Sequence, residues 1–211
     1  MIEHFLNKLS NERIVAIIRG ITGERFNSLI ETLVRNSIMI MEVTVDTPGV
    51  YEKIQHIKEQ YGDQVVIGAG TVLDSETARM AIISGAEFLV SPSLNLDVIK
   101  IAKRYGKVVI PGCMTPTEIV KAYEAGADVI KVFPASTLGP RYFRELSGPL
   151  AHIPLLPTGG VDLDNAQDYI EAGAVAIGLG SSLVGRGGHI INLTEVKEKA
   201  KKFRELVKES T

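Results

Sequence analysis

The sequence has 211 residues, 45% of them hydrophobic and 23% charged, which is typical of a globular chain with a sizeable core and excludes disordered and fibrous proteins. Twenty-three Lys and Arg against 25 Asp and Glu give a formal net charge of -2, so no overall basic field favours nucleic acid or an anionic membrane surface. The longest uncharged stretch, Ala172 to Gly185, is too short to span a membrane.

Short runs rich in β-branched and apolar residues alternate with longer amphipathic stretches along the chain. Each run is followed by turn residues and a helical pattern, which predicts repeated β-α units and a parallel sheet covered by helices. After the fifth run, Thr115, Pro116 and Glu118 form a capping-box pattern that predicts the start of a helix. The eight runs are Ile14–Ile18, Ile38–Val45, Val65–Ala69, Glu87–Val90, Val108–Ile110, Val129–Phe133, Ile153–Leu156 and Ala174–Leu179.

Eight such units predict an α/β fold, a closed (β/α)8 TIM barrel with an extra N-terminal helix near residues 2–9. No stretch of the chain has the composition of an interdomain linker, so we expect residues 1–211 to form a single barrel domain. An open doubly wound sheet is the alternative. In such a barrel, functional side chains are expected where the strands end and the following loops begin.

The single cysteine, Cys113, cannot form an intrachain disulfide, and the first residues carry acidic side chains where a signal peptide needs basic and then apolar ones. We therefore expect a cytoplasmic location. The histidines show no ligand spacing, so zinc chemistry is disfavoured, and we expect neither a metal nor another cofactor. These histidines are His4, His56, His152 and His189.

Two of the predicted strands carry an ionisable residue inside an apolar run, Lys131 in the sixth and Glu42 in the second. Because side chains alternate along a strand, Lys131 can point into the barrel together with Val129 and Phe133. Each residue alone is ambiguous, since a lysine near a strand end can reach solvent and a lone glutamate can lie on the surface. An unpaired buried charge is costly, so the two together predict one shared pocket.

A lysine in a water-poor pocket favours its neutral amine, which can attack a ketone to form a Schiff base. Glu42 is the candidate for the proton transfers that this chemistry needs. An ionised Glu42 beside Lys131 would raise the pKa of the amine and oppose its activation. Arg19, at the end of the first run, is positioned to offset that effect.

Glycine-rich loops follow the last two predicted strands, at residues 158–162 and 178–182. Gly-Gly is a common turn, but backbone N–H groups after strands seven and eight are where barrels commonly bind phosphate. The sequence therefore predicts a phosphate site that includes Gly159, Gly160 and Gly180. Another glycine-rich segment ends at Thr71, which either donates to a carboxylate or belongs to a simple tight turn.

The segment 126–135, Gly-Ala-Asp-Val-Ile-Lys-Val-Phe-Pro-Ala, resembles the KDPG/KHG aldolase family, the 2-dehydro-3-deoxy-6-phosphogluconate and 4-hydroxy-2-oxoglutarate aldolases. Gly-Ala-Gly-Thr at 68–71, Ser91-Pro92 and Pro-Thr-Gly-Gly at 157–160 carry the same resemblance, which runs in order along essentially the whole chain. It implies a class I aldolase, a lyase that is usually a homotrimer and releases pyruvate and an aldehyde from a keto acid.

The resemblance also implies a role for individual residues. Lys131 corresponds to the Schiff-base lysine and Glu42 to the proton-transferring acid/base. Thr71 would hold the pyruvate carboxylate, and Thr158 would help to orient the substrate. The remaining positions are Arg19, Pro92 and Phe133, which would line the pocket, and Gly159, Gly160, Gly180 and Ser181, which would bind the phosphate.

One position departs from the family pattern. Members commonly read Glu-Val-Thr-Leu-Arg-Thr where this chain reads Glu-Val-Thr-Val-Asp-Thr at 42–47, so Asp46 replaces an arginine that helps to bind the substrate carboxylate. An ionised Asp46 cannot do that job. Either Thr71, loop N–H groups and Arg19 suffice, or the natural substrate differs from KDPG.

We predict cleavage of a 2-keto-3-deoxy-6-phospho sugar acid, or of 4-hydroxy-2-oxoglutarate, to pyruvate and an aldehyde such as glyceraldehyde 3-phosphate. The partner is thus a phosphorylated keto acid rather than nucleic acid or a membrane. A metal-free phosphosugar isomerase or epimerase on the same barrel is one alternative. A non-catalytic phosphometabolite-binding protein is another, kept open by Asp46.

Overall fold

A computed structural model describes residues 2–185 and 192–209 of the chain. Helices and strands alternate within it, and each of the predicted β-rich runs overlaps a strand. The helices are α1 (Ile2–Glu12), α2 (Glu24–Arg35), α3 (Val50–Tyr61), α4 (Ser75–Ile83), α5 (Leu96–Arg104), α6 (Pro116–Glu124), α7 (Ala135–Leu146), α8 (Ala166–Glu171), α9 (Ser181–Val184) and α10 (Leu193–Glu209). The strands are β1 (Ile14–Ile18), β2 (Ile40–Thr44), β3 (Val66–Gly70), β4 (Phe88–Val90), β5 (Val108–Ile110), β6 (Gly112–Cys113), β7 (Ile130–Val132), β8 (Leu155–Pro157) and β9 (Ile177–Leu179).

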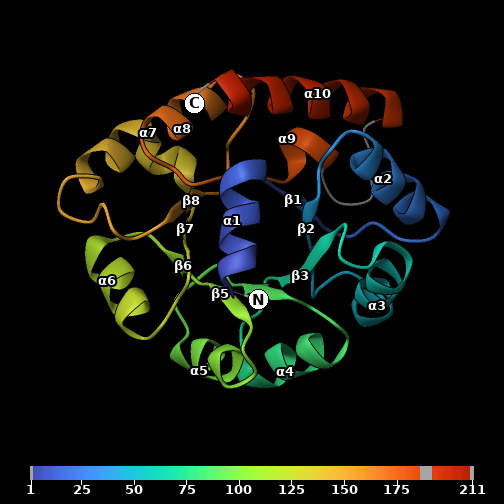
Figure 1. Cartoon of the computed structure of the whole chain (residues 1–211), viewed down its shortest axis with the longest axis horizontal. Coiled ribbons are helices and arrows are strands. Elements are labelled where there is room, and N and C mark those ends of the chain that lie inside the picture. The colour runs from blue at the N-terminus through green and yellow to red at the C-terminus, as the bar shows by residue number, and fades with distance from the viewer. Residues whose placement is uncertain (1, 186–191, 210–211) are drawn as a thin grey trace.

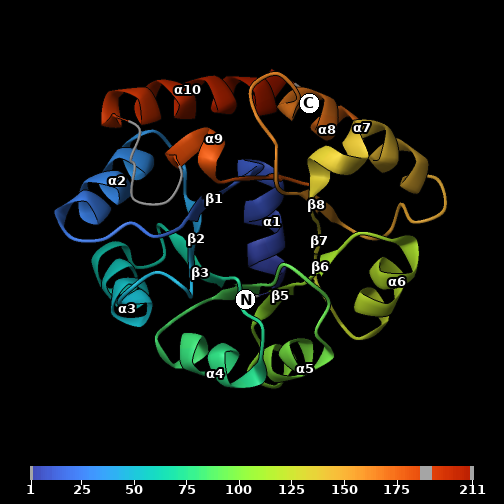
Figure 2. The ribbon, with the colours of Figure 1, turned by 180° about the vertical axis from the view of Figure 1, so that it is seen from behind.

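The strands form two curved parallel sheets around a common interior, with most helices on the outside (Figures 1 and 2). The larger sheet has the order β5-β4-β3-β2-β1-β9, and the smaller has the order β6-β7-β8. The predicted capping box is confirmed at the start of α6, where the Thr115 hydroxyl and the Glu118 carboxylate each accept from the other's backbone N–H. No helix in the described ranges is long and apolar enough to cross a membrane.

The prediction of a closed eight-stranded barrel is wrong, because the hydrogen-bonded ladder is broken at two places. Pro111 directly follows the predicted fifth strand and separates it from a further short strand that was not predicted, so that β5 pairs with β4 while β6 pairs with β7. At the other boundary, Pro157 ends β8. A single hydrogen bond from the Val175 N–H to the Leu155 carbonyl and an isolated bridge between Thr158 and Gly178 lead toward β9, and no ladder forms. Proline has no N–H to donate to a ladder, which gives both breaks a physical reason. The result is an open arrangement of a six-stranded and a three-stranded sheet.

The predicted N-terminal helix is present as α1, and it covers the amino ends of the strands. Its buried side chains Phe5 and Leu9 belong to a small interior core cluster that also includes Val15, Ile40, Val66, Phe88 and Val129. Side chains alternate along a strand, so the face that carries Ile40 on β2 and Val129 next to β7 carries Glu42 and Lys131 two residues later. The interior is therefore apolar at the amino ends and polar at the carboxyl ends.

Charged side chains at the amino ends of the strands form ion pairs. Lys103 Nζ on α5 lies 2.7 Å from Asp128 Oδ1, and the other oxygen of Asp128 accepts from the backbone N–H of Val109. Lys58 Nζ on α3 lies 3.3 Å from Glu87 Oε1, just before β4. These pairs tie outer helices to the beginnings of the strands.

Candidate active site

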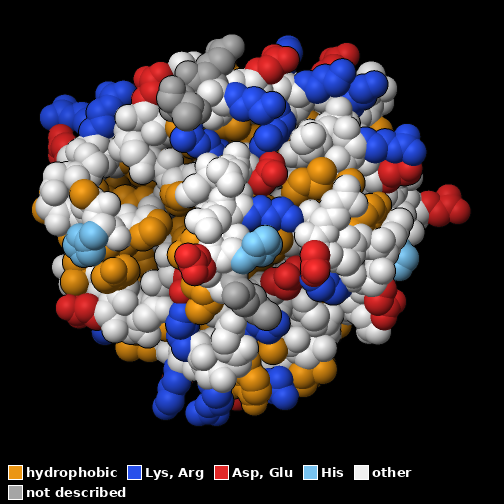
Figure 3. Space-filling model, viewed as in Figure 1, with side chains coloured by type: hydrophobic (Ala, Val, Ile, Leu, Met, Phe, Trp, Pro, Cys, Tyr) orange, Lys and Arg blue, Asp and Glu red, His pale blue; other side chains and the backbone are white. Residues whose placement is uncertain are grey.

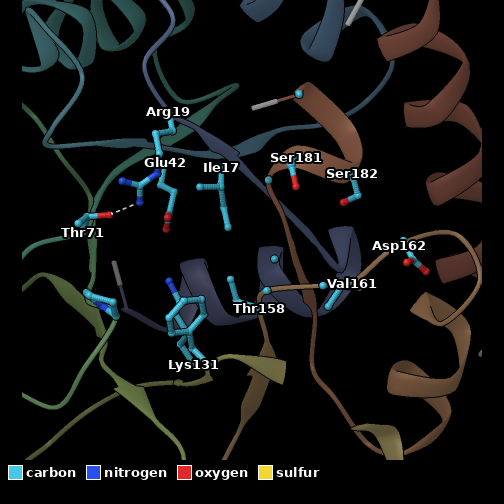
Figure 4. Close-up of a pocket in the computed structure, with 17 residues that line it drawn as sticks. Ile17, Arg19, Glu42, Thr71, Lys131, Thr158, Val161, Asp162, Ser181 and Ser182 are labelled. Carbon is cyan, nitrogen blue, oxygen red and sulfur yellow. Dashed lines mark hydrogen bonds between the residues drawn. The ribbon is translucent and has the colours of Figure 1, made fainter. Parts of the chain in front are cut away.

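A cavity of about 750 Å³ opens at the carboxyl ends of the strands, and all the site residues predicted from the sequence line it. Loops after both sheets contribute to its wall (Figure 4). The lining residues are Ile17, Arg19, Glu42, Thr71, Pro92, Lys131, Phe133, Thr158, Gly159, Gly160, Val161, Asp162, Gly178, Gly180, Ser181, Ser182 and Gly185. Residues more than 160 positions apart in the sequence thus meet in one cavity.

Lys131 extends from the middle of β7 into this cavity, and only 6% of its surface is exposed. Its Nζ lies 5.0 Å from the centroid of the Phe133 ring. Burial lowers the pKa of the Lys131 amine; the nearby Glu42 carboxyl opposes this effect, and the positive charge of Arg19 adds to it. The neutral amine, which is the nucleophilic form, is therefore favoured.

Glu42 lies on β2, is 2% exposed, and points toward Lys131 across the cavity (Figure 4). Burial raises the pKa of the Glu42 carboxyl, although Lys131 and Arg19 act in the opposite direction. Gly70 on the adjacent β3 leaves room for this side chain, because a Cβ there would collide with Glu42 Oε1 and lie 2.8 Å from its Cδ. Residues 68–70 are thus a strand segment where side chains approach the backbone closely, and not the tight turn that the sequence also allowed.

Within the described part of the chain, no hydrogen bond or ion pair engages the Lys131 amine or the Glu42 carboxyl. Each group is instead shifted toward its uncharged form. Each shift favours the form that the chemistry needs, the amine that acts as a nucleophile and the carboxyl that donates a proton. This combination can carry out the addition of an amine to a ketone and the loss of water that follows.

Arg19, Thr71 and Asp46 form a polar row at one side of the cavity. Arg19 Nη2 donates to Thr71 Oγ1 at 2.7 Å, and Arg19 Nη1 lies 2.5 Å from Asp46 Oδ2 (Figure 4 shows the first of these). Thr71 has a φ of 60°, in the left-handed region that non-glycine residues rarely adopt. Asp46, the departure from the family pattern, therefore binds Arg19 and does not itself line the cavity.

The glycine loop after β8 lines the other side of the cavity. Gly159 and Gly160 have φ values of 88° and 76°, and their backbone packs directly on the start of α7. A Cβ at Gly160 would lie 2.6 Å from Ser136 Oγ, and one at Gly159 would lie 3.0 Å from the ring of Phe133. Only glycine fits both the conformation and the space. Gly180 precedes α9, whose first residue Ser181 also lines the cavity.

Thr158 lies between these two sides (Figure 4). It is 4% exposed, and its hydroxyl has no hydrogen-bond partner among the described residues. Gly178 makes room for it, because a Cβ at Gly178 would collide with Thr158 Oγ1. A buried hydroxyl without a partner is costly unless a ligand or water completes it. Thr158 therefore lines the cavity near Lys131 with its hydroxyl packed against Gly178.

Some lining residues were not predicted. Asp162 and Ser182 are the last residues of the predicted glycine loops 158–162 and 178–182, but neither was assigned to the site, because the phosphate was expected to bind the glycines and Ser181. Ile17 faces the cavity because it lies two residues after Val15 on β1, on the same face of the strand. Strand alternation would have predicted this once the inward face of β1 was known. The others are Val161, Gly178 and Gly185.

Among the described residues, no group of three or more His, Cys, Asp or Glu side chains is arranged to hold a metal ion. His189 lies outside the described residues. Burial raises the pKa of the Cys113 thiol on β6 to about 12, with a smaller contribution from the charge of Glu118. Cys113 is thus a neutral packing side chain.

Comparison with known proteins gives one consistent result. The family model described as KDPG and KHG aldolase matches residues 5–198. A 2-dehydro-3-deoxy-6-phosphogalactonate aldolase from Escherichia coli K12 is 36% identical over 197 residues, which cover 92% of this chain and 96% of that one. The chain belongs to the KDPG and KHG aldolase family.

A further relative and a solved structure support the same family assignment. A 2-dehydro-3-deoxy-phosphogluconate aldolase from Treponema pallidum (strain Nichols) is 38% identical over 160 residues, or 74% of this chain and 76% of that one. The solved structure described as "Native KDPGal structure" superimposes with a TM-score of 0.88 at 34% identity, covering 93% of this chain and 95% of that one. The members are aldolases, which are lyases, so the predicted enzyme class is confirmed.

Proposed function

We propose that this chain is a class I aldolase that cleaves a 2-keto-3-deoxy-6-phospho sugar acid to pyruvate and glyceraldehyde 3-phosphate. One observation carries the proposal above all others: the buried amine of Lys131 and the buried carboxyl of Glu42 point toward one another in a single cavity. Family membership supplies the reaction class to which this pair is suited.

The reaction begins with attack of the neutral Lys131 Nζ on the C2 ketone of the keto acid. The resulting carbinolamine loses its hydroxyl as water, for which the protonated Glu42 carboxyl supplies the proton. The product is a protonated Schiff base, whose positive nitrogen can accept an electron pair from the C3–C4 bond. The raised pKa of Glu42 supports this role, because a carboxyl that was ionised at neutral pH would have no proton to give.

Cleavage then needs a base, and Glu42 has become a carboxylate in the preceding step. It takes the proton of the C4 hydroxyl, the C3–C4 bond breaks, and the aldehyde leaves. The pyruvate enamine that remains on Lys131 is protonated at C3 by the same group, and water then hydrolyses the Schiff base. One carboxyl and one amine therefore suffice for a cycle in which protons balance.

The two polar sides of the cavity match the two anionic ends of this substrate. Arg19 and Thr71 bind the carboxylate, and Thr158 contacts a hydroxyl of the chain between the two ends. The backbone N–H groups at Gly159, Gly160, Gly180 and the hydroxyl of Ser181 bind the phosphate. Pro92 and Phe133 supply apolar walls that keep water from the amine.

The configuration of the sugar acid is a finer question. The two relatives described above are named for phosphogalactonate-derived and phosphogluconate-derived substrates. We propose that the chain takes one of these two sugar acids, and that 4-hydroxy-2-oxoglutarate is a poorer substrate because it lacks the phosphate that the glycine loops bind.

The experiment is to incubate the protein with pyruvate and borohydride and to look for a stable adduct by mass spectrometry. The proposal predicts an adduct on Lys131 and release of pyruvate from at least one phosphorylated sugar acid. The absence of an adduct from the folded protein would exclude the mechanism. Interconversion of sugar phosphates without pyruvate would indicate an isomerase, and binding without any turnover would indicate a non-catalytic protein.

We further propose that the protein is a homotrimer, as the family resemblance implies. We also propose that it is cytoplasmic, which the single cysteine supports. An apolar groove of about 730 Å³ between α6 and α7, at the left of the face in Figure 3, offers a surface for such an assembly. Its apolar lining residues are Pro116, Val120, Leu146, Pro149 and Leu150. Light scattering after size-exclusion chromatography tests this assignment, because a trimer has three times the mass of 22.9 kDa.

A further inference from the structure

The mechanism above gives no role to Asp46, a charged side chain beside the cavity. Asp46 follows β2 and contacts Arg19, which follows β1 and in turn contacts Thr71, which follows β3. The two contacts are 2.5 Å and 2.7 Å long. Three neighbouring strand ends are therefore joined by a continuous row of polar side chains.

The turn that carries Asp46 is held in place by its own hydrogen bonds. The backbone N–H of Thr47 donates to the Thr44 carbonyl at 2.9 Å, and the Thr47 hydroxyl accepts from the backbone N–H of Gly20 at 2.9 Å. The second bond joins this turn directly to the loop that follows Arg19. Asp46 therefore offers Arg19 a fixed partner.

Asp46 is ionised at neutral pH. Its partial burial alone would raise the pKa of the carboxyl, but a hydrogen bond with the Thr44 side chain and the charge of Arg19 outweigh that effect and lower it. The contact with Arg19 is thus a charge-assisted hydrogen bond, which is stronger than one between neutral groups.

Arg19 needs such a partner because its side chain is 50% exposed and long enough to adopt many rotamers. A guanidinium has five N–H donors, of which Asp46 and Thr71 engage two. The remaining donors are available to a ligand. Arg19 lines the cavity and Asp46 does not, so any effect of Asp46 on a ligand acts through Arg19.

We propose that Asp46 is a positioning residue, which holds the Arg19 guanidinium against Thr71 so that its free N–H groups bind the carboxylate of the keto acid attached to Lys131. The inference rests on the proposed function and deepens it by defining the carboxylate end of the site. The negative charge of Asp46 repels that carboxylate only weakly, because it is compensated by direct contact with Arg19 and screened by solvent. The binding free energy gained because Arg19 is already ordered is larger than this repulsion.

The test is a double-mutant cycle with Asp46→Ala, Arg19→Ala and the double variant. Asp46→Ala is expected to raise the KM for the keto acid about 3-fold to 10-fold, the cost of ordering one free side chain, and to change kcat less than about 2-fold. In the Arg19→Ala background the same substitution is expected to change nothing further. Asp46→Asn keeps an oxygen acceptor and is expected to fall between Asp46→Ala and the wild type.

Asp63→Ala is the matched control, because Asp63 forms an ion pair with Lys58 away from the cavity, and its loss is expected to leave KM unchanged. A KM that is unchanged or lowered in Asp46→Ala would overturn the proposal. So would an equal rise in KM in the presence and absence of Arg19, since that would indicate a structural role for Asp46.

Calorimetric titration with pyruvate separates this proposal from the proposed function, because binding of the carboxylate does not require turnover. Weaker pyruvate binding in Asp46→Ala, again only when Arg19 is present, supports the positioning role even if no aldol cleavage is found. Equal binding in the wild type and Asp46→Ala overturns it even if the aldolase activity is established.

Discussion

The two ends of the strands treat charged side chains in opposite ways. At the amino ends, Lys103 and Asp128 form a direct ion pair at 2.7 Å, and Asp128 also accepts a backbone N–H. At the carboxyl ends, Lys131 and Glu42 are more deeply buried than that lysine, yet no direct contact between described residues neutralises either. Paired charges stabilise the fold, whereas the two ionisable groups without a direct partner are available for chemistry.

The cost of the unpaired residues depends on pH in a defined direction. The pKa of Lys131 is lowered below its ordinary value of 10.5, so the folded chain binds fewer protons than the unfolded chain, and stability rises as pH rises toward 10.5. The pKa of Glu42 is raised above 4.5, so the folded chain holds a proton that the unfolded chain releases, and stability falls as pH rises above 4.5. At neutral pH both residues therefore lower the stability of the folded chain. Replacing them is expected to reduce activity without reducing stability.

The largest expected effect is that of Lys131→Met. Loss of the nucleophile is expected to lower kcat/KM by roughly 10⁴-fold or more, measured as pyruvate release. Because a buried ionisable group is replaced by an apolar one of similar length, the free energy of unfolding in urea is expected to rise. A Lys131→Met variant that is inactive but less stable would contradict the account of the carboxyl ends.

Glu42→Gln is expected to have the next largest effect. The amide has nearly the same shape but cannot transfer a proton, so kcat is expected to fall by about 10²-fold to 10⁴-fold. The decline in stability above pH 4.5 is expected to become shallower, since the group that causes it has been removed. Full activity in Glu42→Gln would assign proton transfer to another group.

Gly160→Ala tests the other side of the cavity. Its φ of 76° and the closeness of the Ser136 side chain force the loop to shift, so the KM for a phosphorylated substrate is expected to rise roughly 10-fold, the equivalent of one hydrogen bond to a charged group. An unphosphorylated keto acid is expected to show no such rise. Gly139→Ala is the matched control, because Gly139 has a φ of 72° and nothing within 4 Å of an added Cβ. A similar KM change in both variants would attribute the effect to backbone strain.

Lys103→Met is expected to have the smallest effect on activity. It breaks an ion pair whose Asp128 carboxylate is only 9% exposed, so unfolding is expected to become easier by about 1–3 kcal/mol, between the values for exposed and buried pairs. The kcat is expected to stay within about 2-fold of the wild type, since the pair lies at the far end of the strands. The contrast with Lys131→Met would be lost if both substitutions shifted stability in the same direction.

The comparison of the two ends also explains what the sequence could reveal. A lysine or glutamate inside an apolar run is a local signal. Strand alternation left the face of each residue open, and the cost of an unpaired buried charge led to the prediction of one shared pocket, where the structure places both. The strand positions and the Thr115 capping box are local as well, and the structure confirms them. The cavity-lining set follows because consecutive parallel strands bring their carboxyl ends together.

What the sequence did not reveal depends on which strand pairs with which. The break at Pro111 arises because one proline separates two short strands that join different sheets, and a count of apolar runs does not detect it. The contact of Asp46 with Arg19 joins residues 27 positions apart and could not be predicted from either segment. The sequence shows that Asp46 departs from the family pattern, and only the arrangement of strands shows its partner.

The most direct test of the central claim is the pH dependence of pyruvate trapping on Lys131, followed by intact-protein mass spectrometry with cyanoborohydride as the reductant. If the carboxyl ends favour the neutral amine of Lys131, the adduct will form on Lys131 and the trapping rate will reach half of its maximum below pH 10.5. The claim would be contradicted by a folded protein that forms no adduct on Lys131, or by a half-maximum near pH 10.5, the behaviour of an ordinary exposed lysine.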